Sequence, residues 1–232
     1  MSLLARVLET EAMDTAAEAE DYDAMDHAEV NHRFVVDLLR SVAVLDPAAL
    51  PDGLDAVEIL DLGTGTAQIP ILLCRRLPGV RVTACDLAAE MLRVARWNLA
   101  RECLLDRVTL VEADAKDLPE AAGRFPCVVS NSIVHHVAEP ITVLREGWRL
   151  LALGGLVFFR DLFRPADEAS LRHLVDLYAA DANEHQRQLF ADSLRAALTV
   201  EEVRALVEQL GAAPDSVAAT SDRHWTWAAV KA

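Results

Sequence analysis

A chain of 232 residues, of which 53% are hydrophobic, is long enough to bury a full core. This composition excludes an intrinsically disordered chain, and we expect one folded domain over residues 1–232. The net charge of −15 repels phosphate backbones, and no run of Lys and Arg offsets it locally, so nucleic acid is disfavoured as a partner. No apolar run approaches the ~20 residues of a membrane span, and no secretory signal is recognisable, so we expect a cytoplasmic protein without a membrane partner.

The acidic residues near the start of the chain are expected to form a solvated face or a frayed end rather than a site; they are Glu9, Glu11, Glu18, Glu20, Asp21 and Asp23. The four cysteines occur singly among apolar neighbours, without a CxxC pair. They are therefore expected to be reduced core residues, and the sequence predicts no metal site. The cysteines are Cys74, Cys85, Cys103 and Cys127.

Alternating strands and helices dominate residues 57–160. An N-terminal helical segment within residues 1–50 comes first, with apolar residues at helical spacing over 30–39 and turn residues at 46–53. The short apolar run 57–62 suits a buried parallel strand. The pattern then predicts helices at 69–77, 90–102 and 141–151, and strands at 80–85, 108–111, 127–130 and 156–160. This order predicts an α/β fold with a doubly wound, mostly parallel sheet covered on both faces.

The alternation breaks after Arg164-Pro165. Residues 171–180 and 186–198 resemble two helices with no strand between them, so we interpret 165–198 as a helical insertion and a lid. Thr199 and Glu202 make a capping box that starts a helix ending near residue 210. Strands at 216–220 and 224–230 would then form a C-terminal antiparallel hairpin, which brings the sheet to seven strands.

A glycine-rich loop follows the first strand, in the sequence DLGTGTA at residues 61–67. Only glycine lets a backbone turn tightly there and approach a ligand, so Gly63 and Gly65 indicate a site for a nucleoside cofactor. Asp86 ends the second strand, where a carboxylate could accept from ribose hydroxyls. Each signal alone is weak, because the loop could be an empty tight turn and the aspartate a helix cap, but the two support each other.

Two other nucleotide-binding classes fit this loop less well. A dinucleotide fingerprint would have a third glycine where this chain has Gln68, whose side chain would hinder close packing of helix on strand. A phosphate loop of the GxxxxGK[ST] type is absent from the sequence. A nicotinamide-dependent oxidoreductase therefore remains an alternative, and a nucleoside triphosphatase is not supported.

The chain resembles the class I S-adenosylmethionine-dependent methyltransferases over most of residues 20–232. The resemblance begins with EILDLGTGTAQIPI at 58–71. It continues, in order and with ordinary spacing, through CDLAAEMLRVARWNL at 85–99, EADAKDLP at 112–119, RFPCVVSNSIVHHV at 124–137 and LREGWRLLALGGLVFFRDLF at 144–163. It implies a Rossmann-like methyltransferase fold, S-adenosylmethionine as cofactor, and a transferase that acts on a small molecule.

The resemblance also implies a role for individual residues. Gly63 and Gly65 would contact the methionine part of the cofactor, and Asp61 would anchor its amino group together with Asn131 or the Ser130 backbone. Valine at either glycine is expected to abolish cofactor binding in a protein that still folds. The remaining implied contacts are to the ribose and the adenine. Asp86 would take the ribose hydroxyls, Leu87 would pack on the adenine, and Asp114, with Ala115 beside it, would accept from the adenine amine.

The substrate side carries weaker signals. The segment Asn131-Ser132-Ile133-Val134 departs from the Asn-Pro-Pro-aromatic pattern of enzymes that methylate exocyclic amines of bases, a second indication against nucleic acid. His135 or His136 could be a general base, although transfer from a sulfonium can proceed by proximity and in-line orientation without one.

Two further features of the sequence concern the substrate side. Tyr22 is the best candidate of an N-terminal segment that would cover the cofactor. Arg160 and Asp161, which end the fifth strand, could be a simple surface ion pair.

A non-catalytic cofactor-binding protein remains possible as an alternative function. The acceptor and the oligomeric state, including a homo-oligomer, are open.

Overall fold

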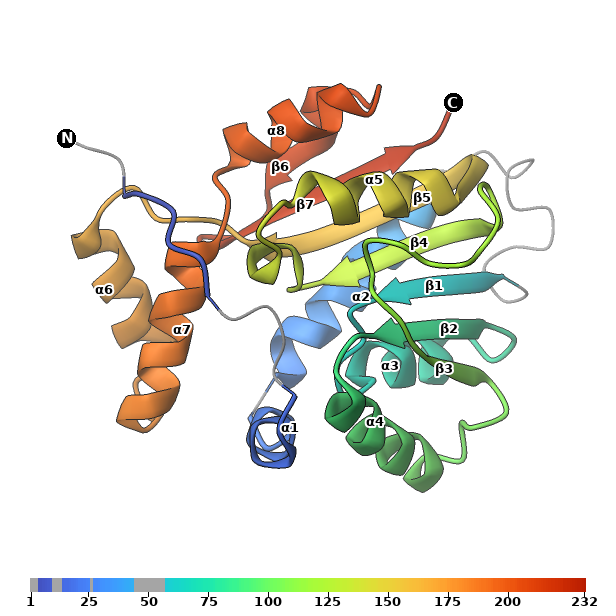
Figure 1. The fold of residues 1–232 in the computed structure, drawn as a ribbon, viewed down its shortest axis with the longest axis horizontal. Helices are drawn as coiled ribbons and strands as arrows, with labels where there is room; N and C mark the ends of the chain where they lie inside the picture. Colours follow the sequence, from blue (N-terminus) through green and yellow to red (C-terminus); the bar gives the residue numbers. More distant parts are fainter. Residues whose placement is uncertain (1–3, 10–13, 26, 44–56) are drawn as a thin grey trace.

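The computed structural model describes residues 4–9, 14–25, 27–43 and 57–232, which form a seven-stranded sheet with helices on both faces (Figure 1). The strands are β1 (Glu58–Leu62), β2 (Arg81–Asp86), β3 (Val108–Glu112), β4 (Phe125–Asn131), β5 (Leu151–Leu162), β6 (Val217–Ala219) and β7 (His224–Val230). Their order is β3-β2-β1-β4-β5-β7-β6. No helix within the described ranges is long and apolar enough to cross a membrane.

The sheet has the predicted topology. β1 to β5 are parallel neighbours, whereas β7 is antiparallel to both β5 and β6. The fold class, including the C-terminal antiparallel hairpin, is therefore confirmed. The chain runs outward from β1 to β3 and then returns to β4 on the other side of β1, and such a reversal opens a crevice at the carboxyl ends of the strands.

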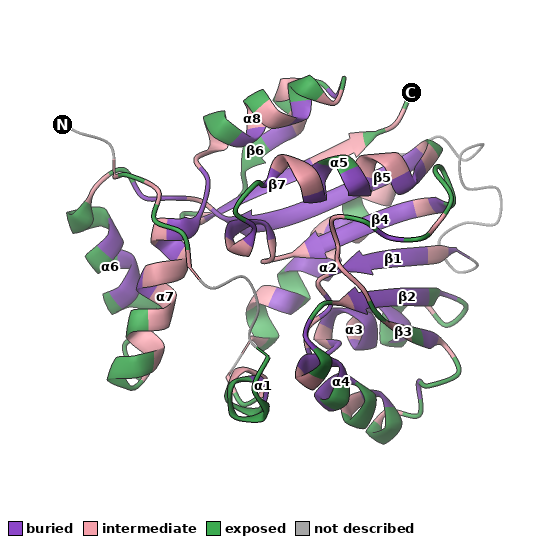
Figure 2. Ribbon diagram, viewed as in Figure 1, coloured by how far each residue is buried: buried purple, intermediate pink, exposed green. Residues whose placement is uncertain are grey.

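Side-chain alternation along the strands builds two cores, one on each face. Ile59 belongs to the core under α2 (Ala28–Ala43), α3 (Gln68–Arg76) and α4 (Ala89–Arg101), whereas Leu60 belongs to the core under α5 (Ile141–Leu150) and α8 (Val200–Gln209). Figure 2 shows the central strands buried along most of their length. The rigid sheet therefore fixes the positions of the residues at its carboxyl edge.

One helix was not predicted. α1 (Ala16–Asp23) begins at Thr15, whose side chain accepts from the Glu18 N–H while the Glu18 carboxylate accepts from the Thr15 N–H. This capping box was readable, but the Ala-rich helix has almost no apolar periodicity, because it buries only Ala19 fully. α1 packs on α4, where Ala19 and Tyr22 contact a cluster that contains Met91. The turn predicted at 46–53 lies outside the described residues.

Helices α6 (Glu168–Tyr178) and α7 (Glu184–Ala196) occupy the stretch predicted to be a helical insertion. They share a small core of their own, to which Leu162 of β5 and Leu4 contribute. Residues 4–9, here called the N-terminal strap, run along this pair: the Leu4 N–H donates to Ala166 O and the Val7 N–H to Arg195 O. The start of the chain is thus tied to residues nearly 190 positions away.

Two smaller expectations are corrected. β5 starts at Leu151 rather than at 156. The pair Gly154-Gly155, which resembles a turn in the sequence, lies within this strand. Gly154 has a φ of +75°, and its N–H donates to Lys231 O. Cys103 is exposed, with a positive φ of 55°, so it is not a core residue. The other three cysteines are buried as expected.

Candidate functional site

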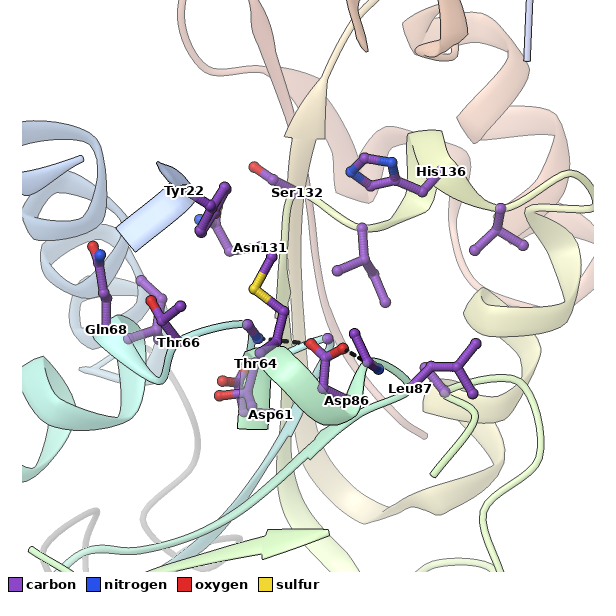
Figure 3. Close-up of a pocket in the computed structure, with 18 of the residues that line it drawn as sticks. Tyr22, Asp61, Thr64, Thr66, Gln68, Asp86, Leu87, Asn131, Ser132 and His136 are labelled. Carbon is purple, nitrogen blue, oxygen red and sulfur yellow. Dashed lines mark hydrogen bonds between the residues drawn. The ribbon is translucent and has the colours of Figure 1, made fainter. Parts of the chain in front are cut away.

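A pocket lies at the carboxyl edge of the sheet, above β1, β2 and β4 (Figure 3). All nine residues that the sequence singled out for the cofactor line it, together with His136, whereas His135 does not line it. These nine are Tyr22, Asp61, Gly63, Gly65, Asp86, Leu87, Asp114, Ala115 and Asn131. The structure therefore brings together residues that are spread over more than a hundred positions of the chain.

The two glycines of the loop differ in what surrounds them. Both have positive φ, +72° for Gly63 and +55° for Gly65. A Cβ on Gly63 would lie 2.0 Å from Ile133 Cγ2, whereas a Cβ on Gly65 would have Tyr22 Cε1 at 3.8 Å as its nearest neighbour. Gly63 is thus required by the protein's own packing, and Gly65 borders the open pocket. Valine at Gly63 would have to displace the Ile133 side chain, so the expectation that this variant folds stays a prediction, and the packing around Gly63 weighs against it.

Asp86 both supports the loop and borders the pocket. Its Oδ2 accepts from the Gly65 N–H at 2.7 Å, and its Oδ1 accepts from the Ala88 N–H at 3.0 Å, the two bonds drawn in Figure 3. The carboxylate consequently acts as a local cap and as a pocket wall at once. Each oxygen retains a further lone pair that could accept from a ligand. Beside it, Leu87 lines the pocket and is 46% exposed, so its apolar surface is available to a ligand there.

Asp114 and Ala115 form the rim beyond β3. Asp114 Oδ1 accepts from the Lys116 N–H at 2.9 Å and lies 3.2 Å from Lys116 Nζ. The Asp114 side chain is 40% exposed, so solvent screens this ion pair and its contribution to stability is small. The carboxylate is nonetheless held in one orientation at the mouth of the pocket.

Asp61 is the buried carboxylate of the site. Its side chain is almost fully buried, and its Oδ2 has no hydrogen-bond partner. Burial raises the pKa of Asp61 to about 7; the nearby Thr64 hydroxyl offsets part of this effect, and the charge of Asp86 adds to it. Asn131 Oδ1, also on the pocket wall, is a second buried acceptor without a partner. The pocket therefore offers unsatisfied acceptors to a cationic or N–H-bearing ligand.

The N-terminal helices close the pocket on one side. Tyr22 is half-buried over Gly65, and burial, with Asp86 as the next cause, raises the pKa of its phenol to about 12, so it remains protonated. Gln68 joins these helices to the loop: its Oε1 accepts from Asn31 Nδ2 at 2.8 Å, and its Nε2 donates to Asp23 Oδ1 at 3.4 Å. The residue that replaces a dinucleotide-type glycine thus connects α1 and α2 to α3.

The two adjacent histidines have different surroundings. His135 is buried behind the pocket, and its Nδ1 lies 2.5 Å from Asp161 Oδ1. Burial alone would lower the pKa of His135, but the Asp161 carboxylate, followed by Glu9, raises it above its ordinary value. His136 lines the pocket, on the segment after β4 and across from Asp61 and Asp86 (Figure 3).

Two interpretations of charged residues were wrong. Arg160 and Asp161 are buried and do not form a surface ion pair: Arg160 binds Thr226 and Asp37, and Asp161 binds His135. Neighbouring side chains on a strand point to opposite faces, which separates the two. Glu9 is not on a solvated face, because its Oε1 lies 3.0 Å from His136 Nδ1 and both of its carboxylate oxygens are 3.3 Å from Ser193 Oγ.

Arg6 on the N-terminal strap was not singled out at all. Its guanidinium donates to the carbonyl oxygens of Ala196 on α7 and of His135, Val137 and Ala138 after β4. These partners lie more than 120 residues away, and no local motif marks such a contact in the sequence. Arg6 thus fixes the backbone that carries both histidines.

Most of the pocket residues lie in a segment that matches known proteins. Residues 59–155, which contain the glycine loop, Asp86, Asp114, Asn131 and both histidines, match the family model described as "Methyltransferase domain". Residues 59–155 therefore form a methyltransferase domain, and this part of the chain is similar to the class I S-adenosylmethionine-dependent methyltransferases. S-adenosylmethionine is the cofactor of this family.

Relatives and solved structures extend the comparison. The methyltransferase domain is 43% identical over 98 residues to a release factor glutamine methyltransferase of Chlorobaculum tepidum, covering 41% of this chain and 33% of that protein. A malonyl-[acyl-carrier protein] O-methyltransferase of Geobacter sulfurreducens is 36% identical over 141 residues, covering 61% of this chain and 48% of that protein. The chain thus spans less than half the length of these two curated relatives.

The fold extends beyond the matched domain. A crystal structure of a candidate S-adenosyl-L-methionine-dependent methyltransferase from Methanococcus maripaludis superposes with a TM-score of 0.68 at 17% identity, covering 97% of each chain. The N-terminal helices, α6, α7 and the C-terminal hairpin therefore belong to an architecture that another protein shares. At this identity the likeness concerns the fold alone.

Proposed function

We propose that this protein transfers the methyl group of S-adenosylmethionine to a small-molecule acceptor. The observation that carries the proposal is Asp61, a buried carboxylate with an unpartnered oxygen at the base of a pocket beside the glycine loop. A buried carboxylate in need of a partner suits the cationic amino group of the cofactor's methionine part. S-adenosylmethionine supplies an electrophilic methyl group on a sulfonium when it is bound.

The other pocket residues divide between the two ends of the cofactor. Gly65 leaves room for close backbone approach, and Asn131 Oδ1 provides a second acceptor near Asp61. At the other end Asp86 would accept from the ribose hydroxyls and Asp114 from the adenine amine, with Leu87 and Ala115 packing on the ring. Tyr22 would cover the cofactor from α1. The lining has three aspartates, Asp61, Asp86 and Asp114, against one lysine, Lys116, and such a mostly acidic wall tolerates a sulfonium better than a basic one would.

Catalysis in this site would rest mainly on orientation. A methyl group held in line with an acceptor atom needs little further assistance, because positioning alone can remove a large part of the barrier. Of the two histidines only His136 borders the pocket, so we propose a direct part in the reaction for His136 alone. His135 would position the segment from behind, through Asp161.

The small-molecule acceptor is supported by charge and by the segment after β4. A net charge of −15 disfavours a nucleic acid, and Asn131-Ser132-Ile133-Val134 lacks the paired prolines of enzymes that methylate base amines. The name of the Geobacter sulfurreducens relative, a malonyl-[acyl-carrier protein] O-methyltransferase, supports an acceptor of small acyl type. We also propose a cytoplasmic location, since the cysteines are free thiols and three of them are buried.

Labelling with a radioactive methyl donor tests the proposal. The full chain would be incubated with labelled S-adenosylmethionine and a cell extract divided into small-molecule, protein and nucleic-acid fractions. We expect label in the small-molecule fraction, and none with Gly65→Val. Label in protein or nucleic acid would reject the acceptor class. Calorimetric binding of S-adenosylmethionine without any transfer would favour a non-catalytic protein, and binding of NAD in its place would favour an oxidoreductase.

A further inference from the structure

A second cluster of metal-ligating side chains lies behind the wall of the pocket. It consists of Glu9 from the N-terminal strap and the adjacent His135 and His136. One ligand atom from each residue lies within 4.8 Å of the other two. None of its atoms is needed to explain how the cofactor is held. The cluster is nevertheless continuous with the pocket, because His136 lines it.

The spacing of the donor atoms suits a metal ion. Glu9 Oε1 lies 3.4 Å from His135 Nε2 and 3.0 Å from His136 Nδ1. Bonds of about 2.1 Å to nitrogen and oxygen donors, at tetrahedral to octahedral angles, separate neighbouring donors by roughly 3.0–3.5 Å. His136 Nδ1 is buried, and although Glu9 Oε1 lies 3.0 Å away, the atom makes no well-aligned hydrogen bond, so the Glu9 carboxylate is the polar group that it faces.

The surroundings orient each ligand as in a metal site. Asp161 Oδ1 lies 2.5 Å from His135 Nδ1 and is itself fixed by the Leu162 N–H at 2.6 Å. A proton held on Nδ1 by this carboxylate leaves Nε2, the atom that faces Glu9, with its lone pair. Metal-ligating histidines almost always donate their other ring N–H in this way, to a carboxylate, a backbone carbonyl or a water. Ser193 Oγ on α7 holds the Glu9 carboxylate from the other side.

The backbone that carries the histidines is also fixed. Arg6 donates to the carbonyl oxygens of His135, Val137 and Ala138, and so it ties the strap and the histidine segment together. Arg6 and Glu9 lie on the same short strap, three residues apart. The arrangement is therefore held together by contacts that do not involve the proposed ion.

We propose that Glu9, His135 and His136 bind one divalent transition-metal ion of the Zn²⁺ class. Two imidazoles and one carboxylate are ligands that first-row transition ions accept, whereas Mg²⁺ and Ca²⁺ prefer oxygen ligands throughout. Three protein ligands leave at least one coordination position open. The sequence predicted no metal site, since Glu9 is separated from His135 by more than 120 residues. The inference does not depend on methyl transfer.

Cobalt titration tests the site directly. Untagged, chelator-treated full-length protein would be titrated with Co²⁺, following its visible ligand-field absorption, and with Zn²⁺ by calorimetry, in both cases without S-adenosylmethionine. We expect one ion per chain and a Co²⁺ spectrum of nitrogen and oxygen ligation. Glu9→Gln and His136→Gln should each weaken binding at least tenfold, and Asp161→Asn by ~10–100-fold, as found for carboxylates behind metal ligands.

Matched controls separate this site from surface histidines. His173→Gln on α6 and His185→Gln on α7 alter exposed histidines and should leave Co²⁺ affinity unchanged. Circular dichroism would show which variants are folded; Glu9→Gln keeps the size and the hydrogen-bonding capacity of the side chain, so it should fold. Absence of stoichiometric binding, or equal affinity in Glu9→Gln and the wild type, would overturn the proposal. The cluster would then be a network of hydrogen bonds and ion pairs.

Discussion

The two walls of the pocket are built in different ways. The first wall, here called the strand-end wall, consists of the ends of β1, β2 and β4 and the loops that follow them. The register of the sheet brings these ends together. The other wall, here called the second wall, is lined by Tyr22 and Asn31 of the N-terminal helices. The N-terminal strap does not line the pocket but supports it from behind, through contacts between residues far apart in the sequence: Arg6 to His135 across 129 positions and Ser193 to Glu9 across 184. Local motifs therefore mark the first wall, whereas on the second only Tyr22 was singled out from the sequence, and no local motif marks the strap.

The walls also differ in how their polar groups are satisfied. On the strand-end wall, Asp61 Oδ2 and Asn131 Oδ1 are buried without partners. On the other side, polar groups bind one another, as Gln68 does with Asn31 and Arg6 with four carbonyl oxygens. Unsatisfied buried acceptors are costly unless a ligand completes them, so Asp61 and Asn131 favour a ligand at the first wall, whereas the bonds of Gln68 and Arg6 fix the elements of the second side in place.

The largest expected effect separates the two glycines of the strand-end wall. Gly63→Ala should lower the free energy of unfolding by roughly 2–4 kcal/mol, because a left-handed residue is strained and its Cβ would overlap Ile133. Gly65→Ala should cost only about 1 kcal/mol of stability, since its Cβ has open space, yet weaken S-adenosylmethionine binding at least tenfold. Urea unfolding and calorimetry would measure both. Equal stability losses in the two variants would contradict the difference in packing.

Asp61→Asn should lower the affinity for S-adenosylmethionine and raise the free energy of unfolding. The native pKa of about 7 lies above that of an unfolded aspartate, so the native state binds more protons between about pH 4 and pH 7, and its stability falls as pH rises through that window. At pH 8 the asparagine variant should therefore be more stable by roughly 1–3 kcal/mol. Its affinity for S-adenosylmethionine should fall by about 10–100-fold, because the charge-assisted bond is lost.

The pH dependence of binding provides the sharper measurement. Wild-type affinity should decline below pH 7, where Asp61 must lose a proton to bind a cationic group, by at most about tenfold per pH unit. Asp61→Asn should bind with little pH dependence over the same range. Asp117→Asn, an exposed aspartate outside the pocket lining, is the matched control and should behave as the wild type. A variant that retained the wild-type pH profile would remove Asp61 from the binding site.

On the second wall, Arg6→Met should act on stability rather than on the cofactor. Loss of the bonds to four carbonyl oxygens should lower the free energy of unfolding by about 1–2 kcal/mol. S-adenosylmethionine affinity should stay within about twofold, the scatter expected for groups that do not touch. Arg172→Met on the exposed side of α6 is the control. A large loss of S-adenosylmethionine affinity in Arg6→Met would mean that cofactor binding depends on the contacts of the N-terminal strap.

The difference between the two walls also explains which site residues could be predicted from the sequence. The strand ends and their site residues, such as Asp61, Gly65 and Asp86, follow from apolar runs that stop at turn residues, because parallel strands must present those ends at one edge. Glu9 could not be found this way, since nothing near it in sequence distinguishes it from a solvated acid. The capping box at Thr15 was readable, but a capping box alone does not say where a helix packs.

The smallest expected effect is on amide exchange, and it concerns which segments close over the bound cofactor. Tyr22 and Asn31 line the pocket, whereas no residue from 165 to 198 does. If the N-terminal helices alone cover the cofactor, S-adenosylhomocysteine should slow amide exchange in α1 and at the start of α2 by about tenfold, roughly 1.4 kcal/mol of local stability, and leave α6 unchanged. If amides in α6 and α7 are also protected from exchange, the 165–198 insertion takes part in closure, and this result would support the lid predicted there. Protection confined to the surroundings of Gly63, Asp86 and Asp114 would reject both lids, because a segment that closes over a ligand must open less often once the ligand is bound.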